Sequence, residues 1–144
     1  MTVSKLLAGK GDFVSIAPPS ATVQDIVDQL ERDDVAAVVI SPDGKAIAGI
    51  ISTRAIATGL KKFGRDVVDR PVRDLMTCEV VTCDIHEPLS KIYELMDEHQ
   101  VRHIPITRDG MLCGIINTLD IVKFRLDEIN SAATALKEYI AGRA

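Results

Sequence analysis

Apolar positions along the chain follow two periods, and the same order of periods occurs twice. A short apolar segment, "DFVSI" or "EVVTC", precedes a stretch whose apolar residues recur three and four positions apart, which predicts an amphipathic helix. A run typical of a buried strand follows, "VAAVVI" or "VRHIPI", and then a second apolar run that ends in Gly-Ile-Ile. With a final helix starting near Thr53 or Thr118, each half predicts the order β-α-β-β-α.

The first predicted helix of each half presents a matching apolar face. Thr22 and Pro88 stand where these helices would begin, because Thr is a favoured N-cap and Pro is tolerated in the first turn. Asp43-Gly44 and Asp109-Gly110 separate the apolar runs that follow, and Asp-Gly is a strong hairpin signal. The apolar faces consist of Val23, Ile26, Val27 and Leu30 in the first half, and of Leu89, Ile92, Tyr93 and Met96 in the second.

A sequence repeat underlies this repetition of elements. Sliding the chain by 66 positions places Ile26 on Ile92 and the two Asp-Gly pairs on one another. A one-residue shortening after the turns then aligns "GIISTRAI" from Gly49 with "GIINTLDI" from Gly114. A unit of about sixty residues would leave one face of its sheet bare. We therefore expect two units related by a pseudo-twofold axis, with two related clefts between them.

The expected fold class is α/β, of the α+β kind, with one unit over residues 13–60 and the other over residues 76–124. Gly64 and Pro71 mark residues 61–75 as a linker that ends in a helical turn. The turn is expected near residues 72–76. The two units and the linker are expected to form one compact module.

Residues 125–144 are expected to form an extended C-terminal helix. Its apolar residues alternate four and three positions apart, which is the spacing of a coiled-coil seam. This pattern leaves two interpretations open: the helix lies on its own domain, or it associates with a second copy. The seam consists of Val122, Leu126, Ile129, Ala133, Leu136 and Ile140.

Composition excludes several classes of protein. With 144 residues, 47% of them hydrophobic, the chain is long enough to bury a core. The formal net charge is −4, and no stretch clusters five or more Lys and Arg, so no nucleic-acid partner is expected. The longest apolar run, Val35–Ile40, is too short to span a membrane, and the N-terminus lacks a signal-peptide core. We expect a cytoplasmic protein with no membrane partner.

The cysteines and the catalytic motifs point away from an enzyme. The three cysteines, Cys78, Cys83 and Cys113, form no CxxC, which fits reduced thiols used for packing. A redox or metal role for Cys78 and Cys83 stays open as a minor alternative, but no metal site is predicted. GxSxG, HExxH, GxxxxGK[ST] and GxGxxG are all missing, so we expect no catalytic activity.

The repeated phrase contains the best candidate chemistry. Ser52 and Asn117 stand at predicted helix starts, where free N–H groups attract phosphate. Asp120 lies one helical turn further, and a carboxylate can accept hydrogen bonds from both hydroxyls of a ribose. On spacing alone, ordinary N-caps and a first-turn acid are the favoured interpretation. His103, inside "VRHIPI", is either a site residue or a strand residue that faces solvent.

Two copies of this element order, each with an Asp-Gly turn and a G-h-h-[ST]-x-x-[DN] phrase, resemble the cystathionine-β-synthase (CBS) domain. The segments "LMTCEVVTC", "VRHIPI" and "GIINTLDI" are especially similar, and the resemblance covers roughly Phe13–Phe124. The tandem resembles a CBS pair, or Bateman module. The resemblance implies a stand-alone regulatory module that forms a homodimer and signals to an unknown regulated protein.

The resemblance also implies an adenosine ligand in each cleft: AMP first, with ADP, ATP, NAD(H) or S-adenosylmethionine as alternatives. In the cleft at the second phrase, Asp120 would bind the ribose and Ile115 would lie against the base. Residues of both units would form the rest of the wall. The added residues are Asn117, Thr118, Leu119, Val14, Ser15, Ala36 and Ala37. The cleft at the first phrase would use Ile50 against the base and residues of both units elsewhere. These are Ser52, Thr53, Arg54, Thr77, Val81, Thr82, Arg102 and His103.

The two phrases depart from the family pattern in different ways. Ala55 replaces the ribose acid in the first phrase, and Asn117 replaces the usual hydroxyl in the second. Because a hydrogen bond to a charged acceptor contributes about 1.5–3 kcal/mol, we expect the Asp120 cleft to bind more tightly. Arg54 would suit the other cleft to a phosphate-rich ligand. The rival hypothesis is a ligand-free dimeric adaptor whose C-terminal helix recruits a partner.

Overall fold

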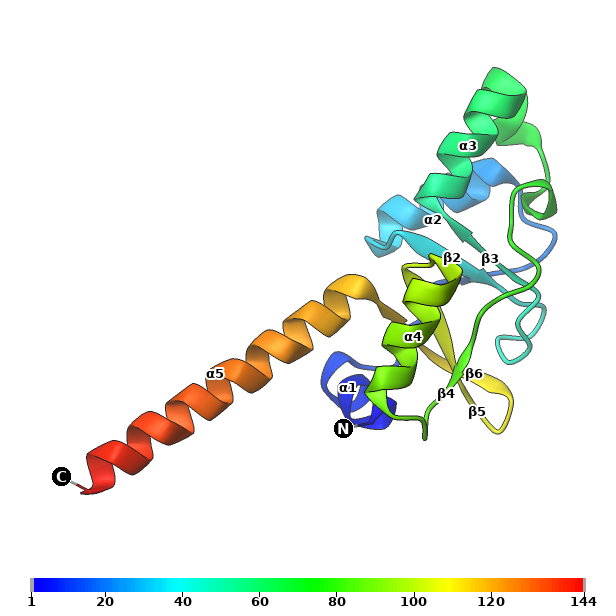
Figure 1. Cartoon of the computed structure of the whole chain (residues 1–144). Coiled ribbons are helices and arrows are strands. Elements are labelled where there is room, and N and C mark those ends of the chain that lie inside the picture. Colours follow the sequence, from blue (N-terminus) through cyan, green and yellow to red (C-terminus); the bar gives the residue numbers. More distant parts are fainter. Residues whose placement is uncertain (1, 144) are drawn as a thin grey trace.

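The computed structural model describes residues 2–143, which form two three-stranded sheets with helices packed beside them. In Figure 1 the two sheets lie next to one another, and the last helix extends far from both. Each repeat contributes one sheet, so the predicted mixed fold of two β-α-β-β-α units is confirmed.

The first unit contains a sheet of order β1-β2-β3, in which β1 is parallel and β3 antiparallel to β2. Thr22 caps α2 as predicted, and its hydroxyl and the Asp25 carboxylate form a reciprocal capping box. Two short 3-10 helices then lead to the second unit. The second of these helices is the helical turn predicted near Val72. The elements are β1 (Ile16–Ala17), α2 (Val23–Asp33), β2 (Ala37–Ile40), β3 (Gly49–Ser52), α3 (Thr53–Phe63), η1 (Gly64–Asp69) and η2 (Val72–Asp74).

The second unit repeats this arrangement with longer strands. Its sheet has the order β4-β5-β6, again with one parallel and one antiparallel pair. Pro88 precedes the first residue of α4, as predicted. The elements are β4 (Cys83–Asp84), α4 (Leu89–His99), β5 (His103–Arg108), β6 (Met111–Asn117) and α5 (Thr118–Arg143).

The extent of the first strand in each unit was predicted wrongly. Only the end of "DFVSI" enters the sheet, as Ile16 of β1, and only the end of "EVVTC", as Cys83 of β4. The residues before them belong to no strand, although the Ser15 carbonyl accepts the Val39 N–H at 2.9 Å. These segments instead lie where the two units face one another.

The two Asp-Gly turns behave differently. Asp109 and Gly110 both have positive φ, 53° and 79°, and form the predicted two-residue hairpin between β5 and β6. The prediction of an equally tight hairpin at Asp43 is wrong, because residues 41–48 form an open loop between β2 and β3. There the Asp43 carboxylate accepts the N–H groups of Lys45 and Ala46, both at 2.9 Å. These local hydrogen bonds replace the ladder, and they lower the pKa of Asp43.

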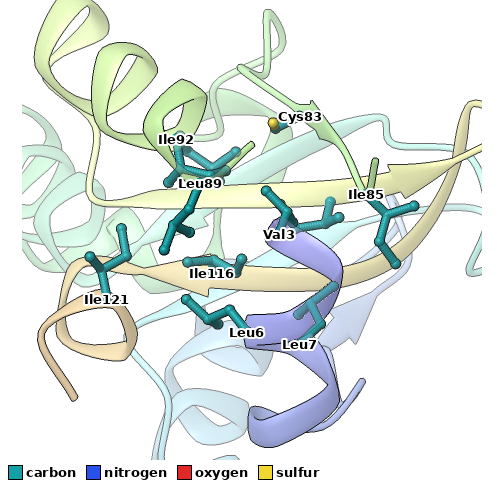
Figure 2. Packing of buried hydrophobic residues seen from close by; sticks show 11 residues of the cluster. Val3, Leu6, Leu7, Cys83, Ile85, Leu89, Ile92, Ile116 and Ile121 are labelled. Atoms are coloured by element: carbon teal, nitrogen blue, oxygen red, sulfur yellow. The ribbon is translucent and has the colours of Figure 1, made fainter. Parts of the chain in front are cut away.

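An N-terminal helix that the sequence did not predict, α1 (Val3–Lys10), packs on the second unit although it precedes the first. Figure 2 shows Val3, Leu6 and Leu7 of α1 against Leu89 of α4 and Ile116 of β6. All five of these side chains are buried. Helix α1 is therefore part of the core of the second unit.

The segment that precedes the second unit packs on the first in the same way. Val72 is fully buried in the core of the first unit, and Leu75 and Met76 pack against that core. The stretch "TVSKLL" from Thr2 therefore corresponds in structure to "PVRDLM" from Pro71. Each unit completes its core with the segment that leads into the other unit.

Helix α5 is continuous from Thr118 to Arg143, and most of it stands clear of the two units (Figure 1). Ile121 is buried at its base, but Leu126, Ile129 and Ile140 are 53%, 63% and 59% exposed. The interpretation that this helix lies on its own domain is therefore wrong. Among residues 2–143, no helix is long and apolar enough to cross a membrane.

Candidate functional site

A cavity of about 260 Å³, called here the first cleft, lies where the end of β3 and the start of α3 face the second unit. It brings together most of the side chains predicted for the site at the first phrase, from both units. Thr82 is the one residue of that predicted set that does not line it. The predicted residues in the wall are Ile50, Ser52, Thr53, Arg54, Thr77, Val81, Arg102 and His103.

Six residues that line the first cleft were not predicted for it. They lie close to predicted residues, on the segments before β2, β4 and β5 and in the first turn of α3. They are Ala36, Ala55, Glu79, Val80, Gln100 and Val101.

Backbone hydrogen bonds fix the floor of the first cleft at Ile50. The Ile50 N–H donates to the Thr77 carbonyl at 3.0 Å, and the Thr77 N–H donates to the Ile50 carbonyl at 2.8 Å. This approach requires Gly49, because a Cβ there would lie 2.7 Å from the Met76 sulfur and 3.0 Å from the Thr77 carbonyl oxygen. The absence of a side chain at Gly49 therefore lets the segment around Thr77, which leads into the second unit, form one wall of the cleft.

The start of α3 holds the polar groups of the first cleft in place. The Ser52 hydroxyl accepts the Ala55 N–H at 3.3 Å as the N-cap. The Thr53 N–H donates to the Ala36 carbonyl at 3.0 Å. Within residues 2–143 this leaves the Arg54 N–H as the first-turn donor without a protein acceptor. Such a donor at a helix N-terminus suits an anion.

Two arginines of the first cleft are suited to phosphate. Arg54 and Arg102 line it together with one acid, Glu79, and neither arginine is in an ion pair with any residue of the described chain. Burial, followed by the nearby charge of Lys10, lowers the pKa of His103, which favours its neutral imidazole. Two guanidinium groups can bind phosphate oxygens, while Ile50 and Val81 provide an apolar surface for a planar base.

A second cavity of about 420 Å³, the second cleft, lies at the related position on the other side of the shared residues Ala36 and His103. Of the residues predicted for this cleft, those in its wall are Ser15, Ala36, Ala37, Ile115 and Asn117. Lys10, Gly11, Phe13, Asp34 and Val35 line it as well and were not predicted.

The remaining residues predicted for the second cleft, Asp120 among them, do not line it. Asp120 lines a neighbouring cavity, which Lys10 also lines. Leu119 is 58% exposed, and the Thr118 hydroxyl lies 3.7 Å from the Met96 sulfur. Val14 is half-buried, next to Ser15, whose hydroxyl donates to Asp33 at 2.6 Å.

Asp120 acts as part of a helix cap. Its carboxylate accepts the Asn117 N–H at 2.8 Å, and the Asn117 side-chain oxygen accepts the Asp120 N–H at 2.8 Å. The same carboxylate oxygen also accepts the ammonium of Lys10 at 2.6 Å. The interpretation of Asn117 as an ordinary N-cap is therefore confirmed. Lys10 lines the second cleft and was not predicted from the sequence.

The cysteines do not form a site with one another. Cys83 is buried in the core of the second unit, and burial, with smaller effects of Glu87 and Asp84, raises the pKa of its thiol to about 11. Burial also raises the pKa of Cys113, whereas Cys78 is exposed. Among residues 2–143, no three His, Cys, Asp or Glu side chains are grouped as a metal ion would require. Cys83 serves to fill the core.

Comparison with known families gives one clear match. The model of the CBS domain matches residues 12–62 and again residues 72–127. The CBS domain-containing protein CBSX3, mitochondrial, of Arabidopsis thaliana is 30% identical over 125 residues, which are 84% of this chain and 61% of that protein. The CBS domain-containing protein YhcV of Bacillus subtilis is 28% identical over 123 residues, 85% of this chain and 86% of YhcV.

Solved structures show the same arrangement. The CBS-domain containing protein ATU1752 from Agrobacterium tumefaciens superimposes with a TM-score of 0.83 at 28% identity, over 87% of this chain and 99% of that one. The CBS domain protein PAE2072 from Pyrobaculum aerophilum, complexed with AMP, has a TM-score of 0.75 at 21% identity, over 83% and 89%. The CBS domain pair of protein MJ0100, in complex with 5′-methylthioadenosine and S-adenosyl-L-methionine, has a TM-score of 0.78 at 19% identity, over 89% and 98%.

Proposed function

This chain belongs to the CBS-domain family, and from that premise we propose that it is a non-catalytic regulatory module that binds an adenosine nucleotide in the first cleft. The observation that carries the proposal is the first cleft itself. Both units line it, and it joins an apolar surface at Ile50 to two guanidinium groups that form no ion pair with residues 2–143. The AMP bound to PAE2072 supports the same class of ligand.

The residues of the first cleft suggest how each part of the ligand would be held. We assign the base to the apolar surface of Ile50 and Val81, where backbone groups near Ala36 can recognise its edge. We assign the phosphate to Arg54 and Arg102, with the Arg54 N–H as a further donor. Ala55 stands where an acid would bind the ribose, so the phosphate contacts are expected to contribute most of the affinity. AMP fits this arrangement best, and ATP or NAD(H) are alternatives.

Regulation would follow from the position of the ligand between the units. A ligand that contacts Ile50 and Arg54 of one unit and Arg102 of the other favours the arrangement that holds these groups together. It can shift an equilibrium only by the difference in its affinity for the two arrangements. We propose that the regulated protein senses this shift. A cytosolic location belongs to the proposal, and the free, exposed thiol of Cys78 suits a reducing compartment.

Binding of AMP should weaken at least tenfold when Arg54 is replaced by glutamine, and likewise when Arg102 is. Loss of a charge-assisted hydrogen bond to phosphate removes about 1.5–3 kcal/mol, while glutamine keeps the length of the chain. Calorimetric titration of the full chain with AMP, ATP, NADH and S-adenosylmethionine measures the effect and identifies the ligand.

The control for this titration is Arg65→Gln, because Arg65 is an exposed arginine on η1 outside both clefts. It should bind AMP as the unmodified protein does. A protein that shows neither heat nor a thermal shift with any of the four ligands would contradict the proposed function. That result would favour the ligand-free adaptor.

We also propose that α5 pairs with α5 of a second copy, because its exposed seam is regular over three heptads from Leu119 to Ile140. Replacing Ile129 with lysine puts a charge into this seam and should raise the dimer dissociation constant at least tenfold. Ser131→Lys changes the opposite face and is the control. Sedimentation over a range of concentrations decides, and an unmodified protein that stays monomeric would contradict pairing.

A further inference from the structure

Next to the second cleft lies a contact that the proposed function does not use: Lys10 lines this cleft, and its partner Asp120 lines the neighbouring cavity. Lys10 is the last residue of α1, and Gly11 ends the helix with a positive φ of 101°. The Lys10 ammonium lies 2.6 Å from an oxygen of the Asp120 carboxylate and 2.5 Å from the Ile115 carbonyl oxygen. The side chains of Lys10 and Asp120 are 24% and 16% exposed, so this ion pair is largely sheltered from water.

The repeat shows what is special about this contact. Ile115 corresponds to Ile50, whose carbonyl in the first cleft accepts a backbone N–H from Thr77. In the second cleft the Ile115 carbonyl accepts the Lys10 ammonium instead. The position of Asp120 is filled by Ala55 in the first cleft. Asp120 is thus paired with a cation beside the second cleft, whereas the first cleft has Ala55 in place of this acid and the Thr77 N–H in place of the Lys10 ammonium.

We propose that Lys10 is a specificity-determining residue that keeps ribose hydroxyls away from Asp120, so that AMP fills the first cleft and leaves the second cleft unoccupied. This inference rests on the proposed function, because it concerns the choice between two related sites for the same ligand. It reverses the order of affinities expected from the acid alone. The acid stands beside the second cleft, but it is already paired with Lys10.

The chemistry of the pair supports this assignment. When a ribose binds Asp120, the carboxylate loses its hydrogen bond to the Lys10 ammonium and gains hydrogen bonds to neutral hydroxyl groups. Hydrogen bonds between charged partners are the stronger ones. The exchange also leaves the Lys10 ammonium without its carboxylate in a partly buried place. The carboxylate oxygen that binds Lys10, Oδ2, also accepts the Asn117 N–H, so a ribose that uses both carboxylate oxygens must compete with these two donors at Oδ2. Removal of the Lys10 charge should therefore free Asp120 for the ribose.

The test is calorimetric titration of the full chain with AMP, comparing the unmodified protein with Lys10→Met, Lys10→Gln and Lys10→Arg. The unmodified protein and Lys10→Arg should bind one AMP per chain. Lys10→Met and Lys10→Gln should bind two, with affinity at the second cleft raised at least tenfold. Adding Asp120→Ala to Lys10→Met should return the stoichiometry to one. Lys5→Met is the matched control, because Lys5 is an exposed lysine of the same helix, and it should behave as the unmodified protein.

The outcomes separate the two proposals. If the unmodified protein binds one AMP and both Lys10→Met and Lys10→Gln do the same with unchanged affinity, the role of Lys10 is overturned and the proposed function stands. A second AMP that also appears in Lys10→Arg or Lys5→Met would overturn the role of Lys10 too. The unmodified protein could instead bind no AMP while Lys10→Met binds one, and adding Asp120→Ala could abolish that binding. This result would support the role of Lys10 and overturn the proposal that AMP binds in the first cleft. No binding by any variant overturns both.

Discussion

Replacing Leu6 with alanine is expected to lower the free energy of unfolding by about 2–5 kcal/mol, the usual cost of removing a buried leucine side chain. Leu6 is only 2% exposed, although it lies six residues from the start of the chain. Its neighbours in the core belong to the second unit, as Figure 2 shows for Ile116 and Ile121. The substitution therefore weakens the unit that is farther away in the sequence. Unfolding in urea, followed by circular dichroism, measures the loss.

The control is Lys5→Ala, since Lys5 is the exposed neighbour of Leu6 on the same helix. Alanine favours a helix at least as much as lysine does, so this change should alter stability by less than about 0.5 kcal/mol. A Leu6→Ala protein as stable as its Lys5→Ala counterpart would show that α1 does not pack on the second unit in solution.

Replacing Gly49 with valine should destabilise the protein by about 1–3 kcal/mol and also impair the first cleft. The new Cβ would lie 2.7 Å from the Met76 sulfur, which can move, and 3.0 Å from the Thr77 carbonyl oxygen, which belongs to the backbone. A shift of Thr77 disturbs its paired hydrogen bonds with Ile50 at the floor of the cleft. AMP affinity should fall together with stability, as measured by urea unfolding and calorimetric titration.

Gly114→Val separates these two effects. Gly114 corresponds to Gly49, but the atoms nearest to a Cβ there belong to the flexible Leu7 side chain, at 3.0 Å, and not to the backbone. This variant should lose stability while it keeps the unmodified affinity of the first cleft. If Gly49→Val binds AMP as tightly as Gly114→Val does, Thr77 does not support the ligand and the assignment of this wall is wrong.

Much of the fold was predictable because the same order of elements occurs twice in the sequence, so each half supports the prediction for the other. The helix capped at Thr22 and the hairpin at Asp109 follow from local signals, and both are present. Most of the first cleft follows from the resemblance to the CBS domain, which implies a site shared by the end of β3 in one unit and the segment before β4 in the other. Thr82 was predicted for this site but does not line the cavity. Glu79, Val80 and Val81 line it, and Thr82 directly precedes Cys83, where β4 joins the sheet.

The features that sequence reasoning missed depend on partners far along the chain. Helix α1 is short, and with Gly9 near its end and Gly11 beyond it, the local helix signal is weak. Its stability comes from a core formed more than eighty residues later. Lys10 is a similar case, because its partner Asp120 lies 110 residues away. The open loop at Asp43 was missed for the opposite reason, since very local side-chain hydrogen bonds outweighed the hairpin signal.

The exchange of leading segments between the units has a consequence for how the chain folds. Helix α1 is synthesised before either unit, but the strand and helix that bury Leu6 are the last of the two units to leave the ribosome. Contacts of such wide sequence separation must wait for the whole chain and slow folding. Val3, Leu6 and Leu7 stay uncovered in the meantime, which is the condition under which nascent chains aggregate or need a chaperone. The two repeats should consequently fold as one cooperative body, with no stable intermediate that contains a single repeat.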